Sequence, residues 1–148
     1  HLEGETVKII ADGSVRVPQV VAAGAVATSG PAAETVRVGL PYTHRMRTMP
    51  AEAGAAKGSA QGQAKRVHKV RLRLLESLGS RCGYVGREQE IPYRRAGYPM
   101  DQAPPLFSGF KEVDPEGGSD DEGVISIEGD DPLPFTCTLL IRELVTHG

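Results

Sequence analysis

The stretch KRVHKVRLRLLE, residues 65–76, decides the fold class that we predict for this chain. Apolar and polar residues alternate along it, and a period of two is typical of a β-strand with one buried face. The face predicted to line a core carries His68, Val70, Leu72 and Leu74. The opposite face carries Val67, Lys69, Arg71 and Arg73. The stretch therefore predicts a core strand of a β domain.

Shorter β-patterns precede this strand. Residues 6–10 are followed by the turn pair Asp12-Gly13, and the alternation resumes around residue 15 and again over residues 36–40. Such short runs separated by turn residues favour hairpins. We predict a small N-terminal β subdomain, a meander or small barrel, over residues 1–45. Residues 46–64 show no sustained period and are predicted to be a long irregular connection, either exposed or acting as an assembly arm against a neighbouring subunit.

Residues 65–148 are predicted to form an antiparallel β-sandwich or barrel, which makes the whole chain all-β. The last and longest predicted strand, residues 135–145, is apolar on both faces. One face carries Cys137, Leu139, Ile141 and Val145, and the other includes Leu140 and Leu144. Apolar residues on both faces predict a central strand or one covered by a partner chain.

Composition limits the classes of function. The chain has 148 residues, no Trp and a formal net charge of -2. This charge gives no overall attraction to nucleic acid or to anionic lipid, so any such contact needs a local patch. No apolar run approaches the ~20 residues of a membrane span, and none is expected. The first residue is His1 rather than Met, so we expect the chain to be part of a longer protein.

The main candidate binding surface is the row formed by Lys69, Arg71 and Arg73. Alternate residues of a strand lie in line, so these cations, with Lys65 and Arg66, match a phosphate backbone. The competing interpretation is a solvated face or a protected sheet edge. A further hypothesis pairs the row with the acidic turn residues Asp120 and Asp121 of a neighbouring subunit.

Chemical motifs are weak. The acidic residues between 114 and 122 do not match a Ca²⁺ loop, and the four His residues have no zinc spacing. No G-x-S-x-G motif is present, and Cys82 and Cys137 are expected to be buried small hydrophobes. We therefore predict no catalytic residues, no metal and no cofactor, and a protein that is not an enzyme.

Five phrases in order resemble a known family: HLEGETVKIIADGSV (1–15), VRVGLPYTHRMRTMP (36–50), AQGQAKRVHKVRLRLLESLG (60–79), PLFSGFKEV (105–113) and DDPLPFTCTLLI (130–141). They are similar to the C-terminal region of phage tail proteins of the tail tubular, nozzle or packaged-DNA-stabilisation kind, found in short-tailed phages and prophages. Residues 94–102 depart from that pattern.

The resemblance implies a β-rich structural subunit that forms a ring at the end of the tail and closes, then opens, the DNA exit channel. Its implied partners are copies of itself and other tail proteins, with weak non-specific contact to DNA. Its implied location is the virion, after synthesis in the host cytoplasm. Two alternatives stay open: a carbohydrate- or receptor-binding module of the virion using Tyr84, Tyr93 and Tyr98, and a secreted enzyme domain with a deep polar pocket.

Overall fold

A computed structural model describes residues 1–52 and 59–147 of the chain, and this described part is all-β without a helix. It contains no helix long and apolar enough to cross a membrane. The strands are β1 (Thr6–Ala11), β2 (Ser14–Val20), β3 (Val36–Gly39), β4 (His44–Arg47), β5 (Ala64–Ser77), β6 (Arg81–Tyr84), β7 (Arg87–Glu90), β8 (Phe107–Val113), β9 (Ile125–Gly129) and β10 (Cys137–His147).

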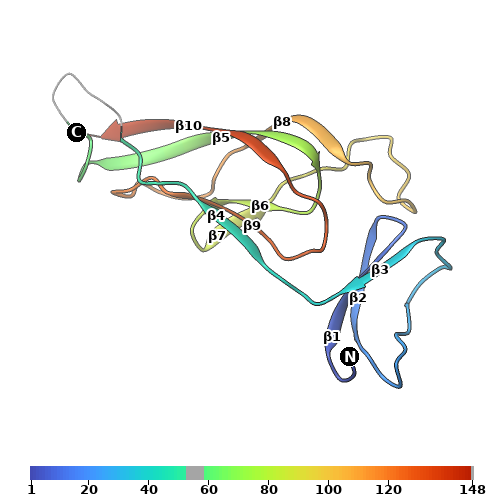
Figure 1. Cartoon of the computed structure of the whole chain (residues 1–148). Coiled ribbons are helices and arrows are strands. Elements are labelled where there is room, and N and C mark those ends of the chain that lie inside the picture. The colour runs from blue at the N-terminus through green and yellow to red at the C-terminus, as the bar shows by residue number, and fades with distance from the viewer. Residues whose placement is uncertain (53–58, 148) are drawn as a thin grey trace.

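The strands form three antiparallel sheets (Figure 1). A small N-terminal sheet has the order β2-β1-β3, and two larger sheets have the orders β10-β5-β8 and β4-β9-β6-β7. Side chains from the two larger sheets share one hydrophobic core, so these sheets form the layers of a sandwich. No sheet closes into a barrel within the described residues, which leaves free edges at β10, β8, β4 and β7.

The sandwich core follows from alternation along β5 and its neighbours. Val70, Leu72 and Leu74 of β5 are buried, and they face Ile125 and Ile127 of β9 in the opposite sheet. Burial of one large aliphatic side chain stabilises a fold by roughly 1.5–3 kcal/mol, so this contact contributes much of the free energy of unfolding. The core strand predicted from residues 65–76 is therefore β5.

A β-bulge in β5 interrupts the predicted alternation of buried and exposed residues. Glu143 pairs with Lys69 and Leu144 pairs with Val67, so His68 is an extra residue in β5. An extra residue reverses the faces of the positions beyond it. Val67 is consequently fully buried, whereas the side chain of His68 is 48% exposed. The prediction that His68 lines the core and Val67 faces outward was wrong.

Strand β10 lies at the edge of its sheet, so the first of the two predicted positions, a central strand, was wrong, and the second, a strand covered by a partner chain, stays a prediction. Its register shifts between Cys137 and Leu139, so Cys137 packs against the core while Leu139 points outward. Leu140 and Leu144 also pack against the core. The outward apolar residues are Leu139, Ile141 and Val145, with exposed fractions of 43%, 41% and 48%.

The N-terminal sheet is a separate small unit with its own core of Val7, Ile9 and Val21. It lies beside one end of the sandwich, away from the end where the chain terminates (Figure 1). Lys8 reaches across, with its Nζ atom 3.6 Å from carboxylate oxygens of both Asp130 and Asp131. The small unit is therefore tied to the sandwich by charge as well as by the chain.

The predicted boundaries at residues 45 and 64 need correction. His44 begins β4 and pairs with Gly129, so β4 belongs to the sandwich although it starts inside residues 1–45. Ala51 and Ala60, within the predicted exposed connection, are buried. Residues 53–58 of the predicted assembly arm lie outside the described residues. The backbone N–H of Ala51 donates to the carbonyl oxygen of Glu122, so this part of the segment is held against the loop before β9.

Candidate functional site

The predicted cationic row lies on the outer face of β5 and is paired within the chain. Nζ of Lys69 is 3.1 Å from Glu112, and Nε of Arg71 donates to the same carboxylate over 2.8 Å. Arg71 also contacts Glu143 of β10 at 2.5 Å. The guanidinium carbon of Arg73 lies 5.8 Å from the centre of the Phe110 ring. The structure brings the three predicted cations together, with carboxylates from both neighbouring strands.

These pairs change the electrostatics of the row. Hydrogen bonds from Arg71 and Lys69 hold the pKa of the Glu112 carboxyl below its ordinary value. The same contacts raise the pKa of Lys69 and of Arg71. The side chains are largely exposed, so solvent screens the interaction and its contribution to stability is small. Most of the positive charge of this face is balanced locally.

Lys65 and Asp120, two other residues of the predicted binding surfaces, already form hydrogen bonds within the chain. Lys65 is buried, and its Nζ donates to the carbonyl oxygen of Asp121 over 2.7 Å. Lys65 therefore cannot extend an exposed cationic stripe. The carboxylate of Asp120 accepts the backbone N–H groups of Glu122 and Gly123, so it organises its own turn. Asp120 and Asp121 were predicted to pair with the cationic row of a neighbouring subunit. One oxygen of the Asp120 carboxylate is already used within its own turn.

The three tyrosines do not form a platform, which corrects the alternative site. Tyr84 and Tyr93 are core residues with exposed fractions of 7% and 8%. The Tyr84 hydroxyl accepts the N–H of Val67 over 2.7 Å, and the Tyr93 hydroxyl lies 2.7 Å from the hydroxyl of Ser80. Only Tyr98 is partly accessible. Aromatic rings in a core satisfy their hydroxyls internally, as these two do.

A different aromatic group is accessible. Tyr42 is 59% exposed, and its ring centre lies 6.3 Å from that of His44. His44 in turn stacks on Phe135 with ring centres 5.3 Å apart. The cleft beside these rings has a volume of about 330 Å³ and is also lined by Met46 and Leu133. Sequence reasoning missed it because Phe135 lies far along the chain and meets β4 only after folding.

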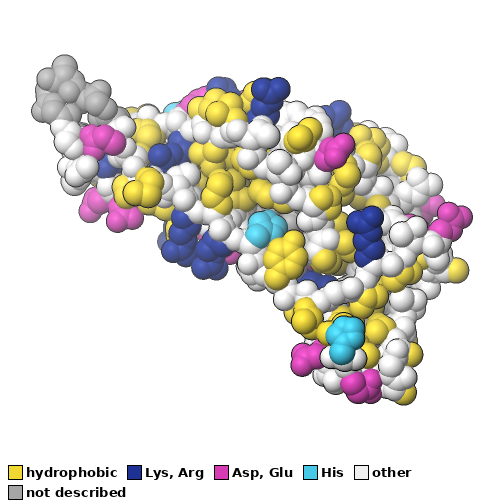
Figure 2. All heavy atoms as spheres, viewed as in Figure 1, with side chains coloured by type: hydrophobic (Ala, Val, Ile, Leu, Met, Phe, Trp, Pro, Cys, Tyr) yellow, Lys and Arg dark blue, Asp and Glu magenta, His cyan; other side chains and the backbone are white. Residues whose placement is uncertain are grey.

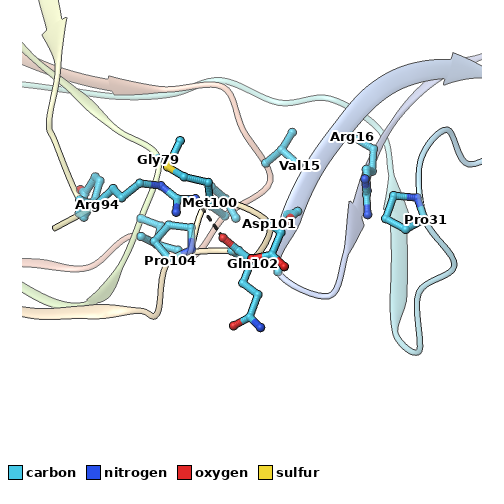
Figure 3. A pocket seen from close by; sticks show the side chains of 15 residues that line it. Val15, Arg16, Pro31, Gly79, Arg94, Met100, Asp101, Gln102 and Pro104 are labelled. Carbon is cyan, nitrogen blue, oxygen red and sulfur yellow. Dashed lines mark hydrogen bonds between the residues drawn. The ribbon is translucent and has the colours of Figure 1, made fainter. Parts of the chain in front are cut away.

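A large pocket lies between the small unit and the sandwich (Figure 3). Its volume is about 610 Å³, and the small unit contributes Val15, Arg16 and Pro31. From the facing loop, Arg94 donates to the carbonyl oxygens of Pro99 and Gln102 over 2.5 and 2.9 Å. In the part of the chain that the structure describes, no hydrogen bond joins a nucleophile to a base in this pocket. Arg94 instead holds the loop together through these two hydrogen bonds.

The cysteines have the environment of core residues. Cys82 is buried, Cys137 is half-buried, and both are free thiols. The pKa of Cys82 is raised to about 12, mainly by burial and to a smaller extent by the nearby Cys137. Burial also raises the pKa of Cys137. Both thiols are thus poor nucleophiles at neutral pH. Among the residues with described positions, no three His, Cys, Asp or Glu side chains are arranged to hold a metal ion.

In comparisons with known proteins, no protein family matched the sequence and no curated protein matched it. The resemblance to phage tail proteins therefore stays an expectation from sequence phrases.

Proposed function

We propose that this chain is a non-enzymatic structural subunit of a phage tail, part of the nozzle or tail-tube end, which assembles into a ring around the DNA exit channel. Two kinds of support exist. The five sequence phrases resemble tail proteins of this kind. The structure adds a surface suited to self-association, and this surface is the observation that carries the proposal.

That surface is the free edge and outer face of β10. The strand has 11 residues and pairs only with β5 among the described strands. Leu139, Ile141 and Val145 point outward along it and are each more than 40% exposed. A long edge strand with unpaired backbone groups and exposed apolar side chains is a template for another chain. In a ring, a neighbouring subunit covers such a surface.

Hydrophobic side chains are also exposed elsewhere on the face shown in Figure 2, so the β10 edge needs its own test.

The test is the mass of the protein in solution. We expect light scattering to give a closed oligomer for the unaltered chain and a smaller species for Ile141→Asp, because a carboxylate cannot be buried in an apolar interface. The matched control is Val17→Asp, which places the same charge on an exposed strand residue of the small unit, 64% exposed. Circular dichroism checks that both variants fold.

A monomer at all concentrations for the unaltered chain would contradict ring assembly by these residues. Equal loss of mass in both variants would show that the β10 face is not the interface. Electron micrographs of the oligomer then separate a closed ring from an open filament, which a heterologous contact also allows.

The alternative function is a carbohydrate- or receptor-binding module of the virion, favoured by the exposed ring of Tyr42 beside His44 and Phe135. A flat accessible ring can stack on the apolar face of a sugar. A glycan array comparing Tyr42→Ala with the unaltered chain tests it, and Tyr98→Ala serves as the control. Binding that depends on Tyr42 in a monomeric protein would favour this alternative over the ring.

A further inference from the structure

Two cations share one aromatic ring at the end of β8. Nζ of Lys111 lies 4.6 Å from the centre of the Phe107 ring, and the guanidinium carbon of Arg95 lies 5.4 Å from it. Lys111 is also 5.7 Å from the ring centre of Tyr93. Cation–π contacts of this kind hold charged side chains in place without neutralising them. The positive charge of both residues stays available.

These cations differ from the row on β5. Lys69 and Arg71 contact Glu112 directly. Within residues 1–52 and 59–147, neither Arg95 nor Lys111 forms an ion pair with a carboxylate, and Nζ of Lys111 donates to the carbonyl oxygen of Pro92. Burial and then repulsion by Arg95 lower the pKa of Lys111. An anion bound near both cations would offset this repulsion.

The loop that carries Arg95 is held by its own contacts. Arg94 fastens it through two backbone carbonyl oxygens, at Pro99 and Gln102, and the N–H of Tyr98 donates to the carbonyl oxygen of Arg95 over 3.3 Å. Figure 3 shows Arg94 directed toward Gln102 along this loop. A cation on a fixed loop loses less conformational entropy when an anion binds.

We propose that Arg95 and Lys111 form a contact for the phosphate backbone of duplex DNA. This inference rests on the proposed function as a subunit around a DNA channel, and it moves the contact from Lys69, Arg71 and Arg73 to the two cations beside Phe107. Charge complementarity selects the partner, because phosphates supply the anions that neither residue meets among the described residues. Phe107 is half-buried and already contacted by both cations, so it is a poor platform for base stacking, and the duplex backbone fits better than a single strand.

Binding should be weak and sensitive to salt. The net charge of -2 opposes approach to DNA, and only a local pair of cations favours it. Each phosphate contact contributes about 0.9 to the slope of log affinity against log salt concentration, so two contacts account for about 1.8. Weak contact of this kind suits DNA that must slide.

The experiment measures fluorescence anisotropy of a labelled DNA duplex at several salt concentrations. The test variant is Arg95→Gln with Lys111→Gln, and the control is Lys69→Gln with Arg71→Gln, which removes the same net charge. We expect the slope of log affinity against log salt concentration to fall by about two for each bound subunit of the test variant, and by much less for the control. Lys111→Arg keeps the charge and should keep the slope.

Three results would overturn the inference: no binding of duplex by the unaltered chain at low salt, equal weakening by both double variants, or equal binding of a polyglutamate peptide, which would indicate an acidic protein partner. Solution mass is measured on the same samples. If the protein forms a ring but its DNA binding does not depend on Arg95 and Lys111, the proposed function stands and the proposed DNA contact is wrong. If the protein forms no ring but the salt slope of DNA binding still depends on Arg95 and Lys111, the proposed assembly is wrong and the DNA contact stands.

Discussion

Arg71 on β5 donates from Nε to Oε1 of Glu112 on β8 over 2.8 Å, and the two residues are direct partners in the antiparallel register. Opposite charges at facing positions of a sheet stabilise the pairing modestly. Glu112 also contacts Lys69, so a single carboxylate serves two cations of the row. The row thus supports the register of the β5 and β8 strands.

The carboxyl of Glu112 should titrate below its ordinary pKa of 4.5, because Arg71 and Lys69 favour its charged form. The lowered folded-state pKa means that the pair contributes stability above the unfolded-state pKa and loses it as the pH falls through the folded-state pKa. Arg71→Gln should move the Glu112 midpoint upward in a carbon NMR titration. Arg87→Gln is the control, since no ion pair of Arg87 is found among the described residues. An unchanged Glu112 midpoint in Arg71→Gln would contradict the pairing.

The bulge at His68 predicts a large loss of stability for one substitution and almost none for its neighbour. Val67→Ala should lower the free energy of unfolding by about 2 kcal/mol, because it removes two buried methyl groups and leaves a cavity. His68→Ala should change it by less than about 0.5 kcal/mol, because the side chain is exposed. Urea unfolding measures both. The reverse order would restore the alternation predicted from sequence and refute the bulge.

The two thiols should differ in reactivity. Native protein at pH 8 should react with a thiol reagent slowly at Cys137, which is half-buried, and negligibly at Cys82, whose pKa burial raises to about 12. Both should react fully in denaturant. Cys137→Ser identifies which thiol reacts first, and rapid labelling of Cys82 in the native state would show that the sandwich core is open.

Gly83 permits the tight β6–β7 pair. A Cβ atom at this position would lie 2.5 Å from the carbonyl oxygen of Arg87, which is backbone and cannot rotate away. Gly83→Ala should therefore destabilise the protein by about 1–3 kcal/mol. Gly39→Ala is the matched control, because a Cβ there meets open space. Equal thermal midpoints for the two variants would exclude the close approach.

Local pattern was enough for several features. Alternation over residues 65–76 correctly placed Val70, Leu72 and Leu74 in the core, because side chains of a strand point alternately to its two faces. The same rule failed at His68, since one inserted residue shifts the alternation without a sequence signal. It also missed the cleft beside Tyr42, because its walls come from β4 and from residue Phe135.

By itself, the sequence determined that the chain is all-β and which residues of β5 are apolar enough to be buried, because the period of two is a local property of the chain. Only the tertiary structure decided that β10 is an edge and that Lys69 and Arg71 are paired with Glu112 and Glu143. It also decided that Arg95 and Lys111 meet no carboxylate among the described residues. Strand order and charge pairing depend on which distant segments become neighbours, and no local pattern specifies that. The outer face of β10 and the cations beside Phe107 are therefore the two surfaces where the proposed assembly and DNA contact can be tested.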